Sequence, residues 1–144
     1  MGSDIRADDG VGLHVVRQLE NRSFSDSVDI VELGTAGLGL LDLVRGYERL
    51  ILVDAILTGS EPGTVHVLDG ADVARASHLG PGHDADLPTV LALGEKLAGD
   101  QMPQEVIVVA VEAVDVKTVS TRLTPAVEAA VSEAVLTVQQ LCAE

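Results

Sequence analysis

Four short runs rich in valine and isoleucine are the feature that most constrains how this chain can fold. They cover residues 28–33, 49–56, 63–68 and 105–114, and polar or turn residues bound each of them. Most of these runs are apolar at consecutive positions rather than at every second one. That pattern is typical of strands covered on both faces, as in a parallel sheet.

Apolar residues at helical spacing lie between these runs. The clearest helix follows Thr124, which can cap it, and has Pro125 at its first helical position. The expected buried faces are Val11, Val15, Val16 and Leu19; Leu38, Leu41 and Val44; Val90, Leu93 and Leu97; and Val127, Val131, Ala134, Val135, Val138 and Leu141.

The alternation of helix and strand predicts a three-layer αβα sandwich with a mostly parallel central sheet, in one domain spanning residues 1–144. Loops are expected at residues 57–62, 70–86 and 116–123, and the middle one is long enough to invite a functional interpretation. The chain opens directly in a strand-to-helix loop, and the strand that would normally precede that loop is missing.

The charge and the cysteine content limit which partners the chain can bind and in which cellular compartment it is expected. Nine basic and 23 acidic residues give a net charge of −14, which disfavours nucleic acid and anionic membrane surfaces and favours a basic protein surface or a metal cation. Cys142 is the single cysteine, so an intramolecular disulfide is excluded. Without a signal-peptide pattern or an apolar run of ~18 residues, the chain is expected to be soluble and cytoplasmic.

Three polar positions fall where open α/β sheets place their sites, beyond the carboxyl ends of strands. Asp8 and Asp9 precede the first helix, Asp54 lies near the end of an apolar run, and His83 lies in the long loop. Two carboxylates and one imidazole suit a borderline divalent metal such as nickel or zinc. Three protein ligands would leave a coordination position open for another group.

Each of the acids also has a structural interpretation. Asp54 would cost several kcal/mol to bury unless paired or bound to a cation, but it could instead bond backbone amides at the strand end. Asp9 is a good helix N-cap. Asp8 has the same alternative and is expected to be the solvated member of the pair.

The histidines are less specific. His78 lies in the same long loop and rivals His83, and spacing alone does not choose between them. His14 falls on the first helix and His66 in a strand, where packing or a surface position is expected.

Several short motifs then resemble the hydrogenase maturation proteases, which trim the C-terminal tail from the large subunit of nickel–iron hydrogenases. They follow the family's order across almost the whole chain. They are residues 6–12 (RADDGVG), 34–38 (GTAGL), 52–55 (LVDA), 62–65 (PGTV), 83–84 (HD) with the helix after it, and 123–125 (LTP).

The resemblance implies a phosphorylase/hydrolase-like fold and endopeptidase activity on a nickel-loaded large-subunit precursor. Asp9, Asp54 and His83 match the positions that bind metal and carry the reaction in this family. The nickel would be supplied by the precursor, although another divalent metal could replace it in vitro. The metal, or a water near it, would polarise the scissile carbonyl. A monomer acting in the cytoplasm is expected.

The sequence also departs from the family pattern. Where the family has an apolar strand and a Gly-x-Gly-Asn turn, this chain has residues 1–4 (MGSD), with Ser3 in the place of the Asn. Leu33 and Asp86 stand where the family often has Gly. We expect the natural protein to begin further upstream; the alternative is a truncated, inactive relative.

Three functional hypotheses therefore remain open. The first is the endopeptidase. The second is a non-catalytic relative that binds the large subunit or nickel without cleaving. The third is a small α/β domain with a nucleotide or sugar ligand, against which the acidic charge and the lack of a phosphate-binding loop count.

Overall fold

The computed structural model describes residues 1–34, 38–75 and 87–144, and its centre is a three-stranded sheet. The strands are β1 (Arg49–Ile56), β2 (Val65–Leu68) and β3 (Glu105–Glu112), in the order β1-β3-β2. β1 runs parallel to β3, and β2 runs antiparallel to it. The sheet is therefore mixed, with its parallel pair formed by the two longest apolar runs.

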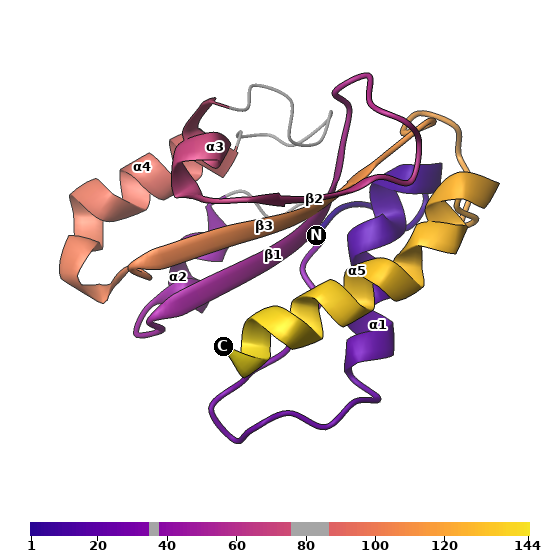
Figure 1. Ribbon diagram of the computed structural model, residues 1–144. Helices are drawn as coiled ribbons and strands as arrows, with labels where there is room; N and C mark the ends of the chain where they lie inside the picture. The colour runs from indigo at the N-terminus through magenta and orange to yellow at the C-terminus, as the bar shows by residue number, and fades with distance from the viewer. Residues whose placement is uncertain (35–37, 76–86) are drawn as a thin grey trace.

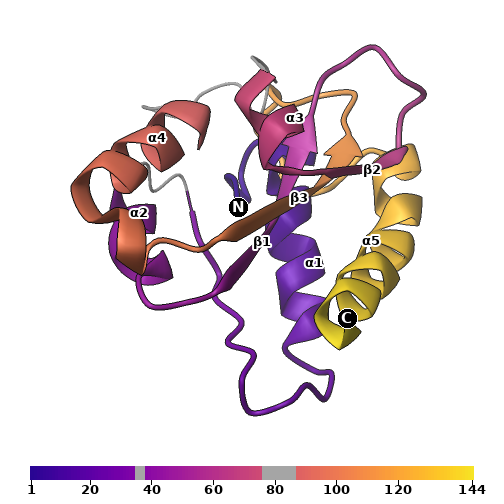
Figure 2. The same ribbon diagram turned by 60° about the vertical axis from the view of Figure 1, so that its left-hand side comes forward.

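Helices cover both faces of this sheet, which confirms the three-layer α/β class (Figures 1 and 2). α1 (Val11–Leu19) and α5 (Pro125–Ala143) pack on one face. The helices on the other face are α2 (Gly39–Val44), α3 (Gly70–Arg75) and α4 (Leu87–Ala98). Two short 3₁₀ helices, η1 (Ala7–Gly10) and η2 (Gly99–Gln101), precede α1 and follow α4.

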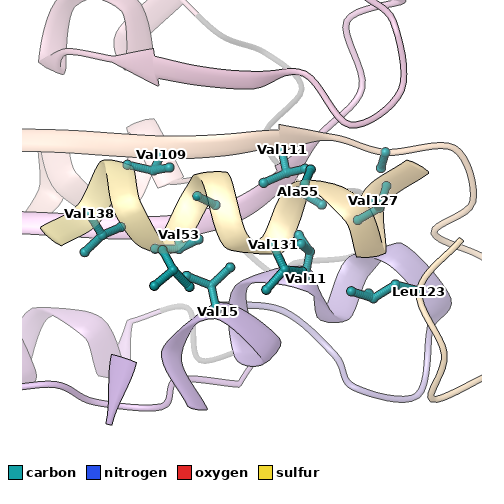
Figure 3. Packing of buried hydrophobic residues seen from close by; sticks show 14 of the residues in the cluster. Val11, Val15, Val53, Ala55, Val109, Val111, Leu123, Val127, Val131 and Val138 are labelled. Carbon is teal, nitrogen blue, oxygen red and sulfur yellow. The ribbon is translucent and has the colours of Figure 1, made fainter. Parts of the chain in front are cut away.

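The core between α1, α5 and the sheet is built almost entirely from valine and alanine (Figure 3). Val11 and Val15 of α1 meet Val131 and Val135 of α5, and all but Val131 are completely buried. Burying a side chain of this size stabilises the fold by about 1.5–3 kcal/mol. An aliphatic core of this kind explains why the chain needs so few aromatic residues.

Burial increases along β1 and β3 towards their carboxyl ends. The last residues of each strand are buried, whereas the first are half-buried or exposed. Side chains alternate between faces, so Val53 and Ala55 point to the α1/α5 side, and Leu52 and Ile56 to the α2/α4 side. A charged residue near the carboxyl end of these strands therefore lies in the most buried part of the sheet.

The prediction of a strand at residues 28–33 is wrong. This segment keeps an alternating exposure, with Val28 and Ile30 half-buried and Asp29 and Val31 exposed. It forms no ladder, because β1 pairs only with β3 among the described residues. Before Arg49, the described residues hold no strand, only an isolated bridge between Arg6 and Ser120.

The buried face of α4 also differs from the expected one. Leu87, Val90 and Gly94 are buried, whereas Leu93 and Leu97 are 37% and 66% exposed. Gly94 lies where α4 packs closely against α2. A methyl group there would lie 2.6 Å from Cδ2 of Leu41, so a residue without a side chain fits best at this contact.

Two further features complete the fold. The first part of the expected loop at residues 70–86 folds as α3. Of the helices in the described ranges, none has the length and apolar character needed to cross a membrane.

Candidate functional site

Asp54 lies inside the buried half of β1, three residues after Ile51, and its side chain is completely buried. Because Leu52 and Ile56 point to the α2/α4 side, the alternation along the strand places Asp54 on that side as well. Its Oδ1 accepts a hydrogen bond from the backbone N–H of Ala55 at 2.9 Å. The expectation of a carboxylate within a buried strand is confirmed.

Asp9 is held in η1, immediately before α1, and is 1% exposed. The N-cap residue of α1 is Gly10, and neither η1 nor α1 has a side-chain cap. The Oδ2 of Asp9 instead accepts a hydrogen bond from the N–H of Ser3 at 2.9 Å. The interpretation of Asp9 as a helix N-cap is therefore wrong.

Gly2 lies between the backbone of Asp9 and the side chain of Asp54. A methyl group on Gly2 would lie 1.9 Å from the carbonyl oxygen of Asp9 and 3.7 Å from Oδ1 of Asp54. The backbone of Gly2 also has φ +122°, a conformation that favours glycine. Only a residue without a side chain fits between the two segments.

The Met1 ammonium lies in the same region, near Asp9 and Asp54. It donates a hydrogen bond to the carbonyl of Val53 at 2.6 Å. Burial lowers the pKa of this ammonium, while the carboxylates of Asp54 and Asp9 act in the opposite direction. Both carboxylates are thus within electrostatic reach of one buried group, although they come from segments far apart in the sequence.

Asp8, expected to be solvated, is completely buried, and that expectation is wrong. Its Oδ2 accepts hydrogen bonds from the N–H groups of Val114 and Asp115, at 2.9 and 3.0 Å. Its Oδ1 accepts one from the N–H of Thr124 at 2.7 Å, and the Thr124 hydroxyl donates to both carboxylate oxygens. Asp8 therefore ties η1 to the segment that joins β3 to α5.

The same contacts explain the start of α5. Thr124 occupies its N-cap position, and Pro125 is at the first helical position, as expected. The Thr124 side chain, however, makes no cap hydrogen bond to the helix, because its hydroxyl is directed to Asp8.

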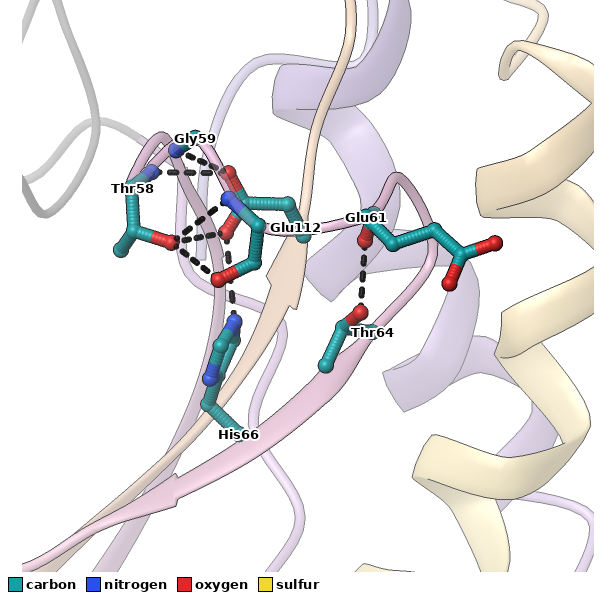
Figure 4. A network of polar contacts seen from close by, with 7 residues as sticks. Thr58, Gly59, Glu61, Thr64, His66 and Glu112 are labelled. Atoms are coloured by element: carbon teal, nitrogen blue, oxygen red, sulfur yellow. Dashed lines mark hydrogen bonds and ion pairs between the residues drawn. The ribbon is translucent and has the colours of Figure 1, made fainter.

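Glu112 forms a second buried network that the sequence interpretation missed (Figure 4). It is the last residue of β3, and its side chain is 2% exposed. Its Oε1 accepts hydrogen bonds from the N–H groups of Thr58 and Gly59, at 2.7 and 3.0 Å. Its Oε2 accepts one from the Thr58 hydroxyl at 2.7 Å and lies 3.2 Å from Nε2 of His66.

Burial alone would raise the pKa of Glu112, but the hydrogen bonds from Thr58, His66 and Gly59 outweigh it. The pKa of this carboxyl is therefore below its usual value, and the group is ionised at neutral pH. The backbone of Glu112 also bonds the same loop: its N–H donates to the carbonyl of Thr64, and its carbonyl accepts from the N–H of Gly63, both at 2.8 Å.

An acid within an apolar run is the signal that identifies Asp54, and it is equally present at Glu112. The signal alone does not separate an acid that fastens a loop from one that binds a ligand. The network around Glu112 depends on Thr58 and His66, which lie 54 and 46 residues away in the sequence.

The third expected ligand, His83, lies outside the described residues, as do its rival His78 and the centre of the expected Gly34–Gly37 turn. In residues 1–34, 38–75 and 87–144, no three His, Cys, Asp or Glu side chains are grouped closely enough to hold a metal ion. The two buried carboxylates supply oxygen donors that fit a divalent cation, and a nitrogen donor would have to come from elsewhere.

One open hollow of about 540 Å³ lies away from these acids. Val67 and Asp69 line it on one side, and Glu105 and Ile107, at the amino end of β3, on the other. Open α/β sheets bind ligands at the carboxyl ends of their strands, so this hollow is not a candidate for the chemistry.

Comparison with known proteins gives a consistent result. The sequence model of a family described as hydrogenase maturation protease matches residues 13–141, which include Asp54 and His83, whereas Asp9 lies just before this range. The hydrogenase expression/formation protein HoxM of Cupriavidus necator is 32% identical over 140 residues, which cover 94% of this chain and 67% of HoxM.

A second relative, HupD of Thiocapsa roseopersicina, is 31% identical over 143 residues. The match covers 90% of this chain but 63% of HupD, so the chain spans less than two thirds of that relative's length.

Among solved structures, the hydrogenase maturating endopeptidase HybD from Escherichia coli superposes with a TM-score of 0.87 at 29% identity. The superposition covers 97% of this chain and 86% of HybD. The family match, the relatives and the superposition agree with one another: this chain belongs to the hydrogenase maturation protease family.

Proposed function

We propose that this chain is an endopeptidase that removes the C-terminal peptide from the large-subunit precursor of a nickel–iron hydrogenase. The observation that carries the proposal is that Gly2 lies between the backbone of Asp9 and the carboxylate of Asp54, and that both acids are buried. The carboxylates of both acids also act on the buried Met1 ammonium, so both lie within electrostatic reach of one positive charge. We infer that the cation they serve in the reaction is the nickel of the precursor.

In this proposal the nickel belongs to the substrate. It arrives already inserted in the precursor, and Asp9, Asp54 and His83 bind it as an exposed group of the incoming protein. Asp9 and Asp54 offer carboxylate oxygens that are anchored by hydrogen bonds from Ser3 and Ala55, which fix their orientation. Binding the metal therefore fixes the precursor's C-terminal segment beside the acids.

The metal supplies Lewis-acid polarisation of the scissile carbonyl or of a nearby water. The chain's own residues contribute orientation and exclusion of water, because Asp9 and Asp54 lie in the most buried part of the fold. Gly34 lies in open space, since a methyl group placed there would meet no atom of the described residues within 4 Å.

The alternative is a relative that binds the large subunit or nickel without cleaving, and it predicts the same buried acids. The hypothesis of a nucleotide- or sugar-binding domain has lost its support, because the family match runs over residues 13–141.

The test is the mass of a nickel-loaded large-subunit precursor before and after incubation with this chain. We expect a C-terminal peptide to be lost from the nickel-loaded precursor and retained on the nickel-free one. The variants Asp54→Asn and His83→Ala should each abolish the mass change. The exposed acid Asp100 offers a matched control, since Asp100→Asn changes the same charge far from the site.

If the precursor binds but keeps its tail, the non-catalytic alternative is correct. If His83→Ala processes the precursor at the normal rate, the proposed ligand set is wrong.

A further inference from the structure

His66 differs from its partner Glu112 in how far it reaches the surface. The Glu112 side chain is 2% exposed and the His66 side chain 23% exposed, with Nε2 of the ring 3.2 Å from Oε2 of the carboxylate. Glu112 is itself fixed by Thr58 and Gly59 (Figure 4). A buried, fully oriented carboxylate thus holds an imidazole whose outer edge is accessible.

The register of the sheet places this imidazole in line with the proposed metal site. Asp54 of β1 pairs with Ala110 of β3, and Ala110 pairs with His66 of β2. Directly paired residues project from the same face, so Asp54 and His66 lie on one face, on either side of the small and fully buried Ala110. Two strand spacings separate their backbones by about 10 Å.

The hydrogen bond to Glu112 decides what the ring can offer. A carboxylate accepts only, so Nε2 carries the proton that points to Glu112. Nδ1 is then left for a ligand, and no described residue hydrogen-bonds to it. Three extended residues span about 10 Å, so a peptide that passes the carboxyl ends of the strands beside Asp54 is long enough to reach His66.

We propose that His66, oriented by Glu112, hydrogen-bonds through Nδ1 to the backbone of the precursor's C-terminal segment and so positions that segment beside the strand ends near Asp54. The inference rests on the proposed function, because it takes the precursor as the ligand. His66 is a binding residue in this scheme, and Glu112 is a positioning residue that acts through it.

Three substitutions separate the two nitrogens of the ring. His66→Phe keeps the ring volume and removes both nitrogens. His66→Gln retains a polar group near the position of Nε2, where it can still reach Glu112. His66→Asn retains an acceptor near the position of Nδ1, where the substrate is expected.

Cleavage of the nickel-loaded precursor by these variants is the test. His66→Phe and His66→Gln should raise KM by up to about tenfold with kcat nearly unchanged, the loss expected for one hydrogen bond. His66→Asn should recover most of the wild-type KM. His14→Phe, a matched change on α1, should leave both constants unchanged, and the unfolding temperature of every variant identifies those that fold poorly.

An unchanged KM in both His66→Phe and His66→Gln would overturn the inference, as would a fall in kcat alone. A wild-type chain that binds the precursor without cleaving it would refute the proposed function only, and the binding affinities of the same variants would then decide the role of His66. A wild-type chain that neither binds nor cleaves the precursor would refute both.

Discussion

Asp8 and Asp9 are neighbours in the sequence and are both buried, yet they belong to different regions of the molecule. Asp8 faces the segment between β3 and α5 and accepts hydrogen bonds from Val114, Asp115 and Thr124. The Asp9 carboxylate accepts a hydrogen bond from Ser3, and its backbone carbonyl lies against Gly2, which also approaches Oδ1 of Asp54. The Asp8 carboxylate thus contacts the β3–α5 segment, and Asp9 lies near the amino terminus and β1.

The difference separates two uses of a buried charge. A carboxylate surrounded by backbone N–H groups stabilises the fold, because its removal leaves those donors without an acceptor. The carboxylates of Asp9 and Asp54 both act on the buried Met1 ammonium, and we propose that they serve a metal cation carried by the substrate. Stability should therefore depend on Asp8, and processing on Asp9 and Asp54.

Asp9→Asn gives the largest expected effect and tests the functional half of the comparison. It should lower the rate of precursor processing by about a thousandfold, because one oxygen ligand is lost at the reacting centre. The free energy of unfolding should change by less than about 1 kcal/mol, since the asparagine side chain keeps an oxygen that can accept the hydrogen bond from Ser3. A denaturant titration and a processing assay on the same sample measure both. Normal processing by Asp9→Asn would contradict the proposed role.

Asp8→Asn tests the structural half. An amide in place of the carboxylate presents a donor to the N–H groups of Val114, Asp115 or Thr124, and the free energy of unfolding should fall by about 3 kcal/mol. Urea titration of this variant beside Asp9→Asn makes the comparison direct. Equal stability of the two variants would show that the two acids are not distinct.

Thr124→Val isolates one contact of the Asp8 region. It removes the hydroxyl that donates to Asp8 and keeps the N–H that does so, and should cost about 2 kcal/mol. Thr124→Ser retains the hydroxyl and should be close to wild type. If Thr124→Val is as stable as wild type and Thr124→Ser is destabilised, the methyl group contributes and the hydroxyl does not.

Glu112 should make the free energy of unfolding depend on pH, and this effect is the smallest of the four. Its pKa is lowered in the folded state, so its contribution to stability is complete above the ordinary carboxyl pKa of about 4.3 and is lost as the pH falls through the lower, folded value. The stability difference between wild type and Glu112→Gln should therefore shrink in that acidic window. Unfolding curves at pH 7 and below 4 measure it, and a constant difference would contradict the assignment.

The sequence predicts Asp54 well because a charge inside an apolar run is costly wherever the chain folds. It predicts β1, β3, α1 and α5 for a related reason, since their apolar patterns reflect contacts with neighbouring elements. The position of Asp8 could not be predicted. Its donors are mostly backbone N–H groups more than 100 residues away, and any residue but proline carries such a group.

At residues 28–33 the sequence instead predicts a strand that the structure does not contain. Its β-branched residues fit a strand, but a strand also needs a neighbour with free hydrogen-bonding groups, which local sequence does not reveal. The single domain, the monomeric state, the cytoplasmic location and the role of His83 stay predictions.

The contacts of Glu112 have a consequence for motion. Its backbone holds Gly63 and Thr64, and its side chain holds Thr58 and Gly59, so a single residue closes both ends of the loop between β1 and β2. The loop therefore cannot fray from one end. It should open as one cooperative unit, with the amide protons of Thr58, Gly59 and Gly63 exchanging with solvent at a common rate.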